Sequence, residues 1–410
     1  MSTSAVGTLR LPARIHVGEG SRAQLPTLLA GYGRRALALV DPYVAGTPLF
    51  AELLGALRGA GLEVRVSTDV QPELPAASLD ASGDLARAYA PDVILAVGGG
   101  SVLDAAKLVA LLAAHGGPLN RYYGENAVPG PVTPVVAVPT TAGTGSEVTP
   151  VAVVSDPDRE LKVGISSLYL VPAAAVVDSE LALGAPAGVT AHSGIDALVH
   201  VVESYTAAPL SPPWDGVLPV FTGRNVFSDT IALEAAGRLA RWLPVAVRDP
   251  QHREARANLA YGSLLGGMSF GATGTHLSHA LQYPVGALTH TPHGLGTGLL
   301  LPYVLEAIRG EQETDRRLAE LGAALGSSAP STAGRVDDAI SAIVRINGEI
   351  GLPGSLADLG VTADQLSRIA ELGLASARLV AIAPVPVTHG LLLGILERAH
   401  VGALRERSTR

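Results

Sequence analysis

Short apolar runs alternate with helix-like segments over the first half of the chain. The runs "ALALV" (36–40), "VILAVGGG" (93–100) and "PVVAVPTT" (134–141) are typical of buried strands. Between the runs lie segments with helical patterns, at 51–61, 79–90 and 102–117. Strands that alternate with helices in this way are typical of a parallel sheet with helices on both faces. We therefore predict an α/β fold for this half.

Helical patterns dominate the second half, as in 194–207 and 229–247. The segment 208–228 is rich in Pro and Gly and predicts a loop between two helices. Turn residues in "LGAPAGVT" place a boundary near residue 186. We therefore expect an α/β domain with a parallel sheet at 1–186, followed by an all-α domain at 187–410.

Composition narrows the function classes. The chain has 410 residues, of which 48% are hydrophobic and 16% charged, and a net charge of −8. This composition favours a globular protein and gives no reason to expect a nucleic-acid or membrane partner. The absence of cysteine excludes disulfides, thiolate nucleophiles and Cys-based metal sites. We see no signal peptide and no apolar run long enough to cross a bilayer, so we expect a cytoplasmic protein.

Two small-residue segments follow predicted strands. In "AVGGGSVLDAAK" (96–107), three glycines and a serine stand between a strand and a helix, where free N–H groups can meet a phosphate. An alternative is a plain turn with Ser101 as the helix N-cap. The segment "VPTTAGTGSEVTP" (138–150) is a second candidate, or an ordinary loop. Together they would line a nucleotide crevice, and Asp41 after an earlier strand could accept hydrogen bonds from a ribose.

Histidines and one aspartate indicate a metal site. In "GIDALVH", Asp196 and His200 are four residues apart, hence on one helical face. The alternative is that Asp196 only orients His200 in the core. His279 and His293 could complete a set suited to Fe(II), Zn, Mn or Ni. His276, one turn from His279, is a rival ligand, and His290 could line the same cavity.

The segments "GGGSVLDAAK", "PTTAGTGSEVT", "GIDALVHVVESY" and "HALQYPVGALTHTPHG" occur in this order. With them the chain resembles the iron-containing, or group III, alcohol dehydrogenases of the dehydroquinate-synthase-like fold. The resemblance implies an N-terminal dinucleotide-binding domain and a helical domain, with the metal in the cleft between them. It assigns the metal ligands and catalytic centre to Asp196, His200, His279 and His293, and leaves His276 outside the motif. The cofactor-binding residues that it implies are Asp41, Gly99, Gly100, Ser101, Asp104, Thr140, Thr141, Thr144, Thr149, Val151 and Lys162.

These features predict a metal-dependent oxidoreductase that transfers a hydride between NAD(H) and an alcohol/aldehyde or hydroxy-acid/oxo-acid pair, with the substrate oxygen on the metal. We expect Fe(II) as the divalent metal, Zn as the next choice, NAD rather than NADP because of Asp41, and a homodimer. Two alternatives are a lyase or cyclase of the same fold that uses NAD transiently, and a catalytically idle binding protein. The first would need clustered Lys and Arg for phosphates, which we do not see, and the second conflicts with an intact ligand set.

The chain departs from the family pattern in three places. The usual HAxxHPxGA is "HALQYPVGA" here, so Tyr283 replaces a histidine that is often thought to relay a proton. The common Asn-Pro-Arg near the C-terminal end is absent, and "APVPVTHGLLLGILERA" (383–399) stands there. The loop "PVFTGRNVFSD" (219–229) is similar to that of the hydroxyacid–oxoacid transhydrogenase branch. Arg224 is therefore either a group that meets an anionic substrate or a solvated loop charge.

Overall fold

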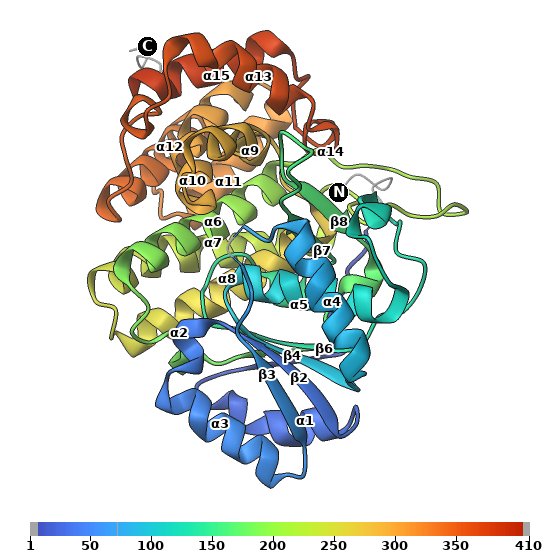
Figure 1. Ribbon diagram of the computed structural model, residues 1–410. Coiled ribbons are helices and arrows are strands. Elements are labelled where there is room, and N and C mark those ends of the chain that lie inside the picture. The colour runs from blue at the N-terminus through green and yellow to red at the C-terminus, as the bar shows by residue number, and fades with distance from the viewer. Residues whose placement is uncertain (1–6, 72, 405–410) are drawn as a thin grey trace. The chain divides into compact units, whose positions relative to one another are not determined.

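The computed structural model describes residues 7–71 and 73–404. The chain divides into two compact units (Figure 1). The α/β unit contains residues 10–185 and 217–220, and the helical unit contains residues 7–9, 186–216 and 221–404.

A six-stranded parallel sheet forms the centre of the α/β unit, in the order β1-β9-β6-β4-β2-β3. The strands are β1 (Arg14–Val17), β2 (Arg35–Val40), β3 (Glu63–Ser67), β4 (Val93–Gly98), β6 (Val135–Pro139) and β9 (Ala174–Val177). The chain passes from β2 to β3 on one side and returns to β4 on the other side of β2. The sheet therefore has a topological switch point between β2 and β4, where open α/β sheets bind ligands beyond the carboxyl ends of their strands.

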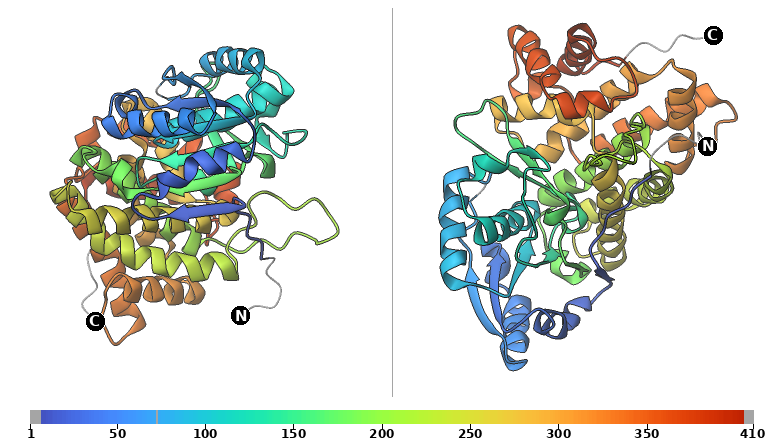
Figure 2. Two further views of the ribbon diagram at one scale, coloured as in Figure 1. Left: turned by 90° about the horizontal axis from the view of Figure 1, so that it is seen from below. Right: turned by 90° about the vertical axis from the view of Figure 1, so that its right-hand side faces the viewer.

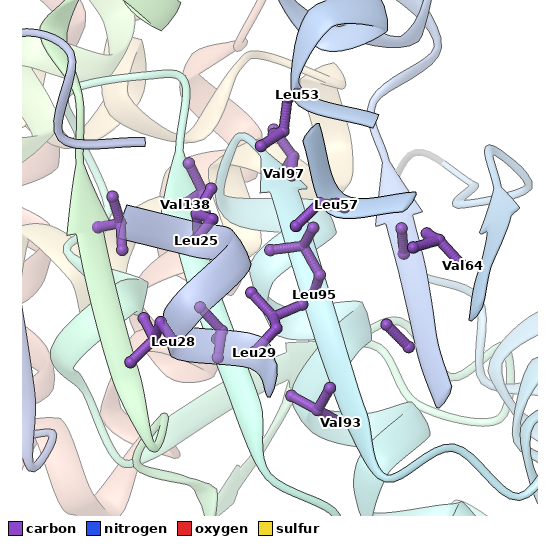
Figure 3. Close-up of a cluster of buried hydrophobic side chains, with 14 of the residues drawn as sticks. Leu25, Leu28, Leu29, Leu53, Leu57, Val64, Val93, Leu95, Val97 and Val138 are labelled. Carbon is purple, nitrogen blue, oxygen red and sulfur yellow. The ribbon is translucent and has the colours of Figure 1, made fainter. Parts of the chain in front are cut away.

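The two faces of this sheet follow the alternation of side chains along each strand. Ala38, Val40, Leu95 and Val97 belong to one buried cluster, whereas Leu39 and other alternate residues belong to the cluster on the opposite face. Helices α1 (Leu25–Ala30) and α3 (Pro48–Gly59) supply most of the leucines of the first cluster, as the close-up of α1 over the strands shows (Figure 3). Helices α4 (Ala76–Tyr89) and α5 (Gly100–His115) cover the second face.

The α/β unit has smaller elements besides the main sheet. These are α2 (Pro42–Ala45) and a three-stranded sheet of β5 (Gly124–Glu125), β8 (Val163–Ser166) and β7 (Val151–Val154). In the small sheet β5 and β8 are parallel, and β7 and β8 are antiparallel. The predicted strands at 36–40, 93–100 and 134–141 correspond to β2, β4 and β6.

Helices build the remainder of the described chain. Their bounds are α6 (Ala187–Thr206), α7 (Val226–Arg248), α8 (Arg253–Thr273), α9 (Leu277–Thr289), α10 (His293–Ile308), α11 (Gln312–Ala324), α12 (Thr332–Glu349), α13 (Leu366–Leu374), α14 (Ala377–Ala381) and α15 (His389–Val401). The predicted fold class, an α/β part with a parallel sheet followed by a helical part, is confirmed. No helix in the described ranges is both long and apolar enough to span a membrane.

Helix α6 is buried on nearly all sides, because it packs against α7, α8 and α10. Such burial explains why its sequence is apolar around the whole helix rather than along one stripe. The Pro- and Gly-rich segment between α6 and α7 is an extended loop without a helix, as predicted (Figure 2). It ends at Asn225, whose side chain accepts hydrogen bonds from the Phe227 and Ser228 amides and caps α7.

Candidate metal centre and nucleotide site

Helix α6 places Asp196 and His200 on one face, one turn apart, and both are buried. His200 Nε2 lies 3.8 Å from Asp196 Oδ2. The His200 ring stacks on Phe270 of α8, with centroids 4.1 Å apart, and on His279, with centroids 4.8 Å apart. Stacking with these two rings holds the imidazole beside Asp196.

Two further histidines converge on the same carboxylate from other helices. His279 on α9 has its Nε2 3.8 Å from Asp196 Oδ1. His293, the first residue of α10, has its Nε2 3.7 Å from the same oxygen. The ligand-capable atoms of Asp196, His279 and His293 all lie within 4.8 Å of one another. His200 approaches the other carboxylate oxygen, so the structure brings together all four side chains that the sequence singled out.

The local geometry fits a divalent ion. Two ligands of a tetrahedral ion at about 2.1 Å each would be about 3.4 Å apart, close to the nitrogen-to-oxygen separations of 3.7 and 3.8 Å. In the described part of the chain, His200 Nδ1 and His279 Nε2 are buried without a hydrogen-bond partner. Burying such a polar atom without a partner costs about 1–3 kcal/mol. A bound ion would satisfy His279 Nε2 directly.

Charge also favours a cation here. Burial lowers the pKa of His279 well below its usual value, and the neighbouring His200 and His293 lower it further. The ring is therefore neutral at pH 7 and keeps a lone pair. Burial opposes ionisation of Asp196, but the surrounding histidines and the Thr297 hydroxyl outweigh it and lower the pKa of Asp196. The site thus offers one carboxylate and neutral imidazole nitrogen, the donors that divalent transition metals accept.

Helix α10 supports this arrangement in two ways. Thr297 is buried, and its hydroxyl lies 3.0 Å from Asp196 Oδ1, to which it donates. A β-carbon at Gly294 would overlap the carbonyl oxygen of His192 and lie 2.8 Å from the β-carbon of Asp196. A glycine directly after His293 is therefore what allows α10 to approach α6 this closely. The sequence analysis did not single out Thr297, although it lies four residues after His293.

The rival His276 is fully engaged elsewhere. Its Nδ1 accepts from the Leu277 amide at 2.8 Å, and its Nε2 lies 2.9 Å from the Thr206 hydroxyl. Burial lowers the pKa of His276, so the ring is neutral and both of its nitrogens are used. His290 is exposed and ends α9 in a left-handed conformation, with φ 54°. These contacts favour His279 over His276 as a ligand and give His290 a role in ending the helix.

Tyr283 and Arg224 belong to the segments in which this chain differs from the family pattern. The Tyr283 ring stacks on His293, with centroids 5.9 Å apart and planes 24° apart. Arg224 forms an ion pair with Glu313 at 3.1 Å and lies 3.9 Å from Asp229. Both acids also pair with other arginines, Glu313 with Arg316 and Asp229 with Arg317. Arg224 therefore belongs to an ion-pair network, which favours a structural role for this loop charge.

The predicted cofactor residues begin at the switch point of the sheet. The backbone N–H of Asp41 donates to the Val97 carbonyl oxygen at 2.9 Å, so the ends of β2 and β4 are adjacent. Asp41 Oδ1 accepts from the Tyr43 and Val44 amides, at 2.9 and 3.3 Å, and caps α2. This capping role was missed, although Asp followed by Pro at the first helical position is a known N-terminal signal.

The glycine segment contacts the threonine segment. A β-carbon at Gly99 would lie 3.3 Å from Thr141 Oγ1, and one at Gly100 would lie 2.5 Å from a carbon of Thr144. Only glycine fits Gly100, and the two loops therefore form one surface. Helix α5 begins at Gly100 with Gly99 as its N-cap and no side-chain cap. Ser101 is thus inside the first turn and exposed, so the alternative of a Ser101 N-cap is wrong.

A buried polar cluster holds the threonine segment in place. Asp104 accepts from the Ser146 hydroxyl at 2.6 Å and from the Val153 amide at 3.0 Å. The Lys107 ammonium donates to the carbonyl oxygens of Thr149 and Val151, both at 2.9 Å. Burial lowers the pKa of Lys107 to about 8 although Asp104 opposes this. Lys107 was not singled out from the sequence, although it is the only lysine of this otherwise largely apolar helix.

The last two predicted cofactor residues are less tightly grouped. Thr140 is buried directly after β6, and its amide donates to the Gly98 carbonyl at 3.0 Å. Lys162 precedes β8 and pairs with Glu73. Thr140 therefore joins the surface between β4 and β6, whereas the charge of Lys162 is already paired.

Comparison with known proteins decides the family. A family model described as "Iron-containing alcohol dehydrogenase" matches residues 12–179, and "Fe-containing alcohol dehydrogenase family, C-terminal" matches residues 190–400. The chain belongs to the iron-containing alcohol dehydrogenase family. Membership confirms the resemblance seen in the sequence and the predicted class of metal-dependent alcohol oxidoreductase.

Curated relatives cover nearly the whole chain. The long-chain-alcohol dehydrogenase 1 of Geobacillus thermodenitrificans (strain NG80-2) is 34% identical over 98% of this chain and 99% of its own length. The NAD-dependent methanol dehydrogenase of Bacillus methanolicus is 34% identical over 88% of this chain and 91% of its own length. A crystal structure of a 1,3-propanediol oxidoreductase superposes with a TM-score of 0.88 at 30% identity, covering 96% of this chain and 100% of that one.

Proposed function

We propose that this protein is an NAD-dependent alcohol dehydrogenase that uses one divalent metal held by Asp196, His200, His279 and His293. The convergence of these four side chains carries the proposal, because it includes a buried His279 nitrogen with no protein partner. A divalent ion in this set would supply Lewis-acid chemistry to a substrate oxygen. The ligands on α6 and α9 are buried, while the His293 side chain is 36% exposed. A substrate would therefore approach the ion from the side of His293. We propose Fe(II) as the resident ion, as the family name suggests, with Zn as the next choice.

We propose that the dinucleotide binds at the switch point of the α/β unit. Its pyrophosphate would meet the amides of Gly100 and Ser101 at the uncapped start of α5. Thr141 and Thr144 line the same surface, and Asp41 ends the adjacent strand. A carboxylate there would accept from a ribose hydroxyl and repel a 2′-phosphate, which favours NAD. NAD would supply the hydride acceptor. The similar methanol dehydrogenase of Bacillus methanolicus is named as NAD-dependent.

Four further residues would contribute to dinucleotide binding only indirectly: Asp104, Thr149, Val151 and Lys107. Asp104 and Lys107 have their hydrogen bonds directed to the protein, so they hold the threonine segment against α5. Their loss would move the surface that receives the dinucleotide. Thr140 lies on the same surface, and Lys162 could reach a phosphate only by leaving Glu73.

The substrate pair is either an alcohol and aldehyde or a hydroxy acid and oxo acid. The second pair needs a cation near the metal site, and Arg224 is already paired with acids. Arg378 on α14 stacks over Phe221, 4.5 Å from its centroid, and forms no ion pair among the described residues. Burial is the main cause of the low pKa of His279, followed by His200 and His293, and the charge of Arg378 makes a smaller contribution in the same direction. We propose Arg378 rather than Arg224 as the group that would meet a substrate carboxylate.

Paired variants test this choice. Arg378→Met should lower kcat/KM for 4-hydroxybutanoate by at least about tenfold, or about 1.4 kcal/mol, and leave 1,4-butanediol unchanged. The matched control Arg224→Met should change neither value beyond about twofold. Equal effects of Arg378→Met on both substrates, or no effect, would remove the hydroxy-acid option.

The proposed function as a whole is tested by NAD reduction with metal-reconstituted protein over a panel of alcohols and hydroxy acids. We expect turnover that disappears with a chelator and returns with Fe(II) or Zn. Protein that binds metal but reduces no NAD would favour the lyase or cyclase alternative. Protein that binds neither metal nor NAD would favour an idle binding protein.

We also propose a cytoplasmic homodimer. A chain without cysteine needs no oxidising compartment for its fold, which is compatible with the cytoplasm, and the dimer is an expectation from the family resemblance. Light scattering after size-exclusion chromatography should give twice the chain mass of 41.7 kDa. Fractionation of cells should find the protein with cytoplasmic markers, and recovery with the membrane fraction would contradict the proposal.

A further inference from the structure

Glu203 is a buried carboxylate beside the candidate metal centre. It lies on α6, three residues after His200, and is 0% exposed. Asp196, His200 and Glu203 follow one another at intervals of four and three residues, so α6 presents all three on one face. A carboxylate is rarely buried this completely unless hydrogen bonds compensate for the lost water.

The compensation comes from the start of α9. Glu203 Oε2 accepts from the His276 amide at 2.8 Å, and Oε1 accepts from the Ser278 amide at 2.5 Å. Oε2 also lies 2.7 Å from Nδ1 of His279. Both backbone partners can only donate, so the geometry fits a carboxylate whose two oxygens are acceptors.

This contact fixes the tautomer of His279. Because Glu203 accepts, Nδ1 of His279 must carry the hydrogen. The lone pair is then on Nε2, which is buried without a partner and lies 3.8 Å from Asp196 Oδ1. The same hydrogen bond prevents the ring from rotating its unprotonated nitrogen away from Asp196.

Glu203 also lies between the two histidines that compete in the sequence. Its Oε1 is 3.4 Å from Nδ1 of His276, but that nitrogen already accepts from the Leu277 amide. The Thr206 hydroxyl donates to the Val202 carbonyl at 2.7 Å, so it accepts from Nε2–H of His276. His276 thus has no lone pair to offer, while His279 has one that faces Asp196.

We propose that Glu203 is a positioning residue for the metal, which acts by holding His279 in the tautomer and orientation that bind the ion. The inference rests on the metal site of the proposed function and adds a residue to it. Carboxylate–histidine–metal arrangements tune ligand basicity as well as direction, and loss of such a carboxylate typically weakens metal binding by about 10–100-fold.

The test measures metal binding rather than turnover. Glu203→Gln keeps the size but replaces one acceptor oxygen with an NH₂ group that faces donors. Apo protein prepared with a chelator should bind Zn or Co(II) about 10–100-fold more weakly than wild type in competition with a chromophoric chelator. The visible absorption of the Co(II) form should also change. The matched control is Thr206→Val, which removes a buried hydroxyl from the neighbouring His276 and should leave metal affinity within about twofold.

The melting temperature of the apo protein separates positioning from a purely structural role. If Glu203→Gln lowers this temperature but binds metal as wild type does, Glu203 only caps α9 and the inference is wrong. A wild type that binds no metal would overturn the proposed function together with the inference.

A second measurement does not depend on the variant folding. Nitrogen-15 NMR of histidine side chains in the apo wild type, with His279 identified through His279→Gln, should show Nδ1–H and an unprotonated Nε2. The opposite tautomer would overturn the inference.

Discussion

The two candidate sites are built from different parts of the chain. In the helical unit, side chains from α6, α9 and α10 converge. Glu203 accepts a hydrogen bond from His279, and Thr297 donates one to Asp196. In the α/β unit, the candidate nucleotide surface consists of backbone amides and small residues at strand ends. Buried polar side chains beneath this surface form hydrogen bonds that fix its loops. The metal site therefore depends on which atoms a few side chains carry, and the nucleotide site depends on the shape of the backbone.

The largest effect should come from removing a metal-facing side chain. His200→Ala removes a ring that contacts Phe270 and His279 and lies beside Asp196. Bound metal measured by mass spectrometry and kcat/KM should fall together, the latter by at least about a thousandfold, or about 4 kcal/mol in the barrier. The control His290→Asn changes an exposed histidine and keeps a residue that tolerates its left-handed conformation. Retained metal in His200→Ala would show that the other three groups suffice.

A shape change in the α/β unit should have a smaller effect and leave the metal in place. The added β-carbon of Gly100→Ala would press on Thr144, so the two loops must separate. We expect the KM for NAD to rise by at least about tenfold, or about 1.4 kcal/mol, with unchanged metal content. The control Gly55→Ala adds a methyl on α3, where the described structure has no heavy atom within 4 Å apart from the neighbouring backbone of the same helix. Metal loss in Gly100→Ala would contradict the independence of the two sites.

Cofactor preference tests the polar part of the nucleotide site. Asp41→Ser keeps an oxygen that can cap α2 and removes the charge. The ratio of kcat/KM for NAD to that for NADP should fall by about tenfold, with little change in melting temperature. Wild-type enzyme that uses NADP as well as NAD would show that Asp41 does not face the 2′-position.

The smallest effect is expected at Tyr283. Tyr283→Phe keeps the ring that stacks on His293 and removes the hydroxyl. The loss in kcat/KM should stay below about tenfold, because the variant retains the ring packing and we expect the hydroxyl to transfer no proton. A loss between about a hundredfold and ten-thousandfold would instead show that the hydroxyl acts as a general acid or base.

The sequence predicted the main strands and helices well, for physical reasons. The strands at 36–40 and 93–100 are buried on both faces, which produces continuous apolar runs. The spacing of Asp196 and His200 is local to one helix and could be read directly. His279 and His293 could be named as candidates from the sequence, but only the family resemblance assigned them, since their convergence with Asp196 depends on how three helices pack.

The supporting residues could not be recognised in the same way. Glu203 and Lys107 are ordinary charged residues in sequence, and only burial shows that their charges must be compensated. The choice between His276 and His279 required the hydrogen-bond partners of each ring. For Arg224 the sequence left two roles open, an anion-binding group and a loop charge, and its ion pair with Glu313 favours the second. Such partners come from distant parts of the chain, so no local pattern encodes them.

The spacing of Asp196, His200 and Glu203 on α6 also limits how the length of this segment can change. Each residue of an α-helix turns the chain by about 100°. An insertion of one residue after Asp196 would carry His200 and Glu203 to another side of the helix, although every side chain would still be present. An insertion of seven residues would restore the direction to within about 20° but displace both groups by about 10 Å along the axis. Insertions and deletions between these three residues would therefore separate them even when no side chain is substituted.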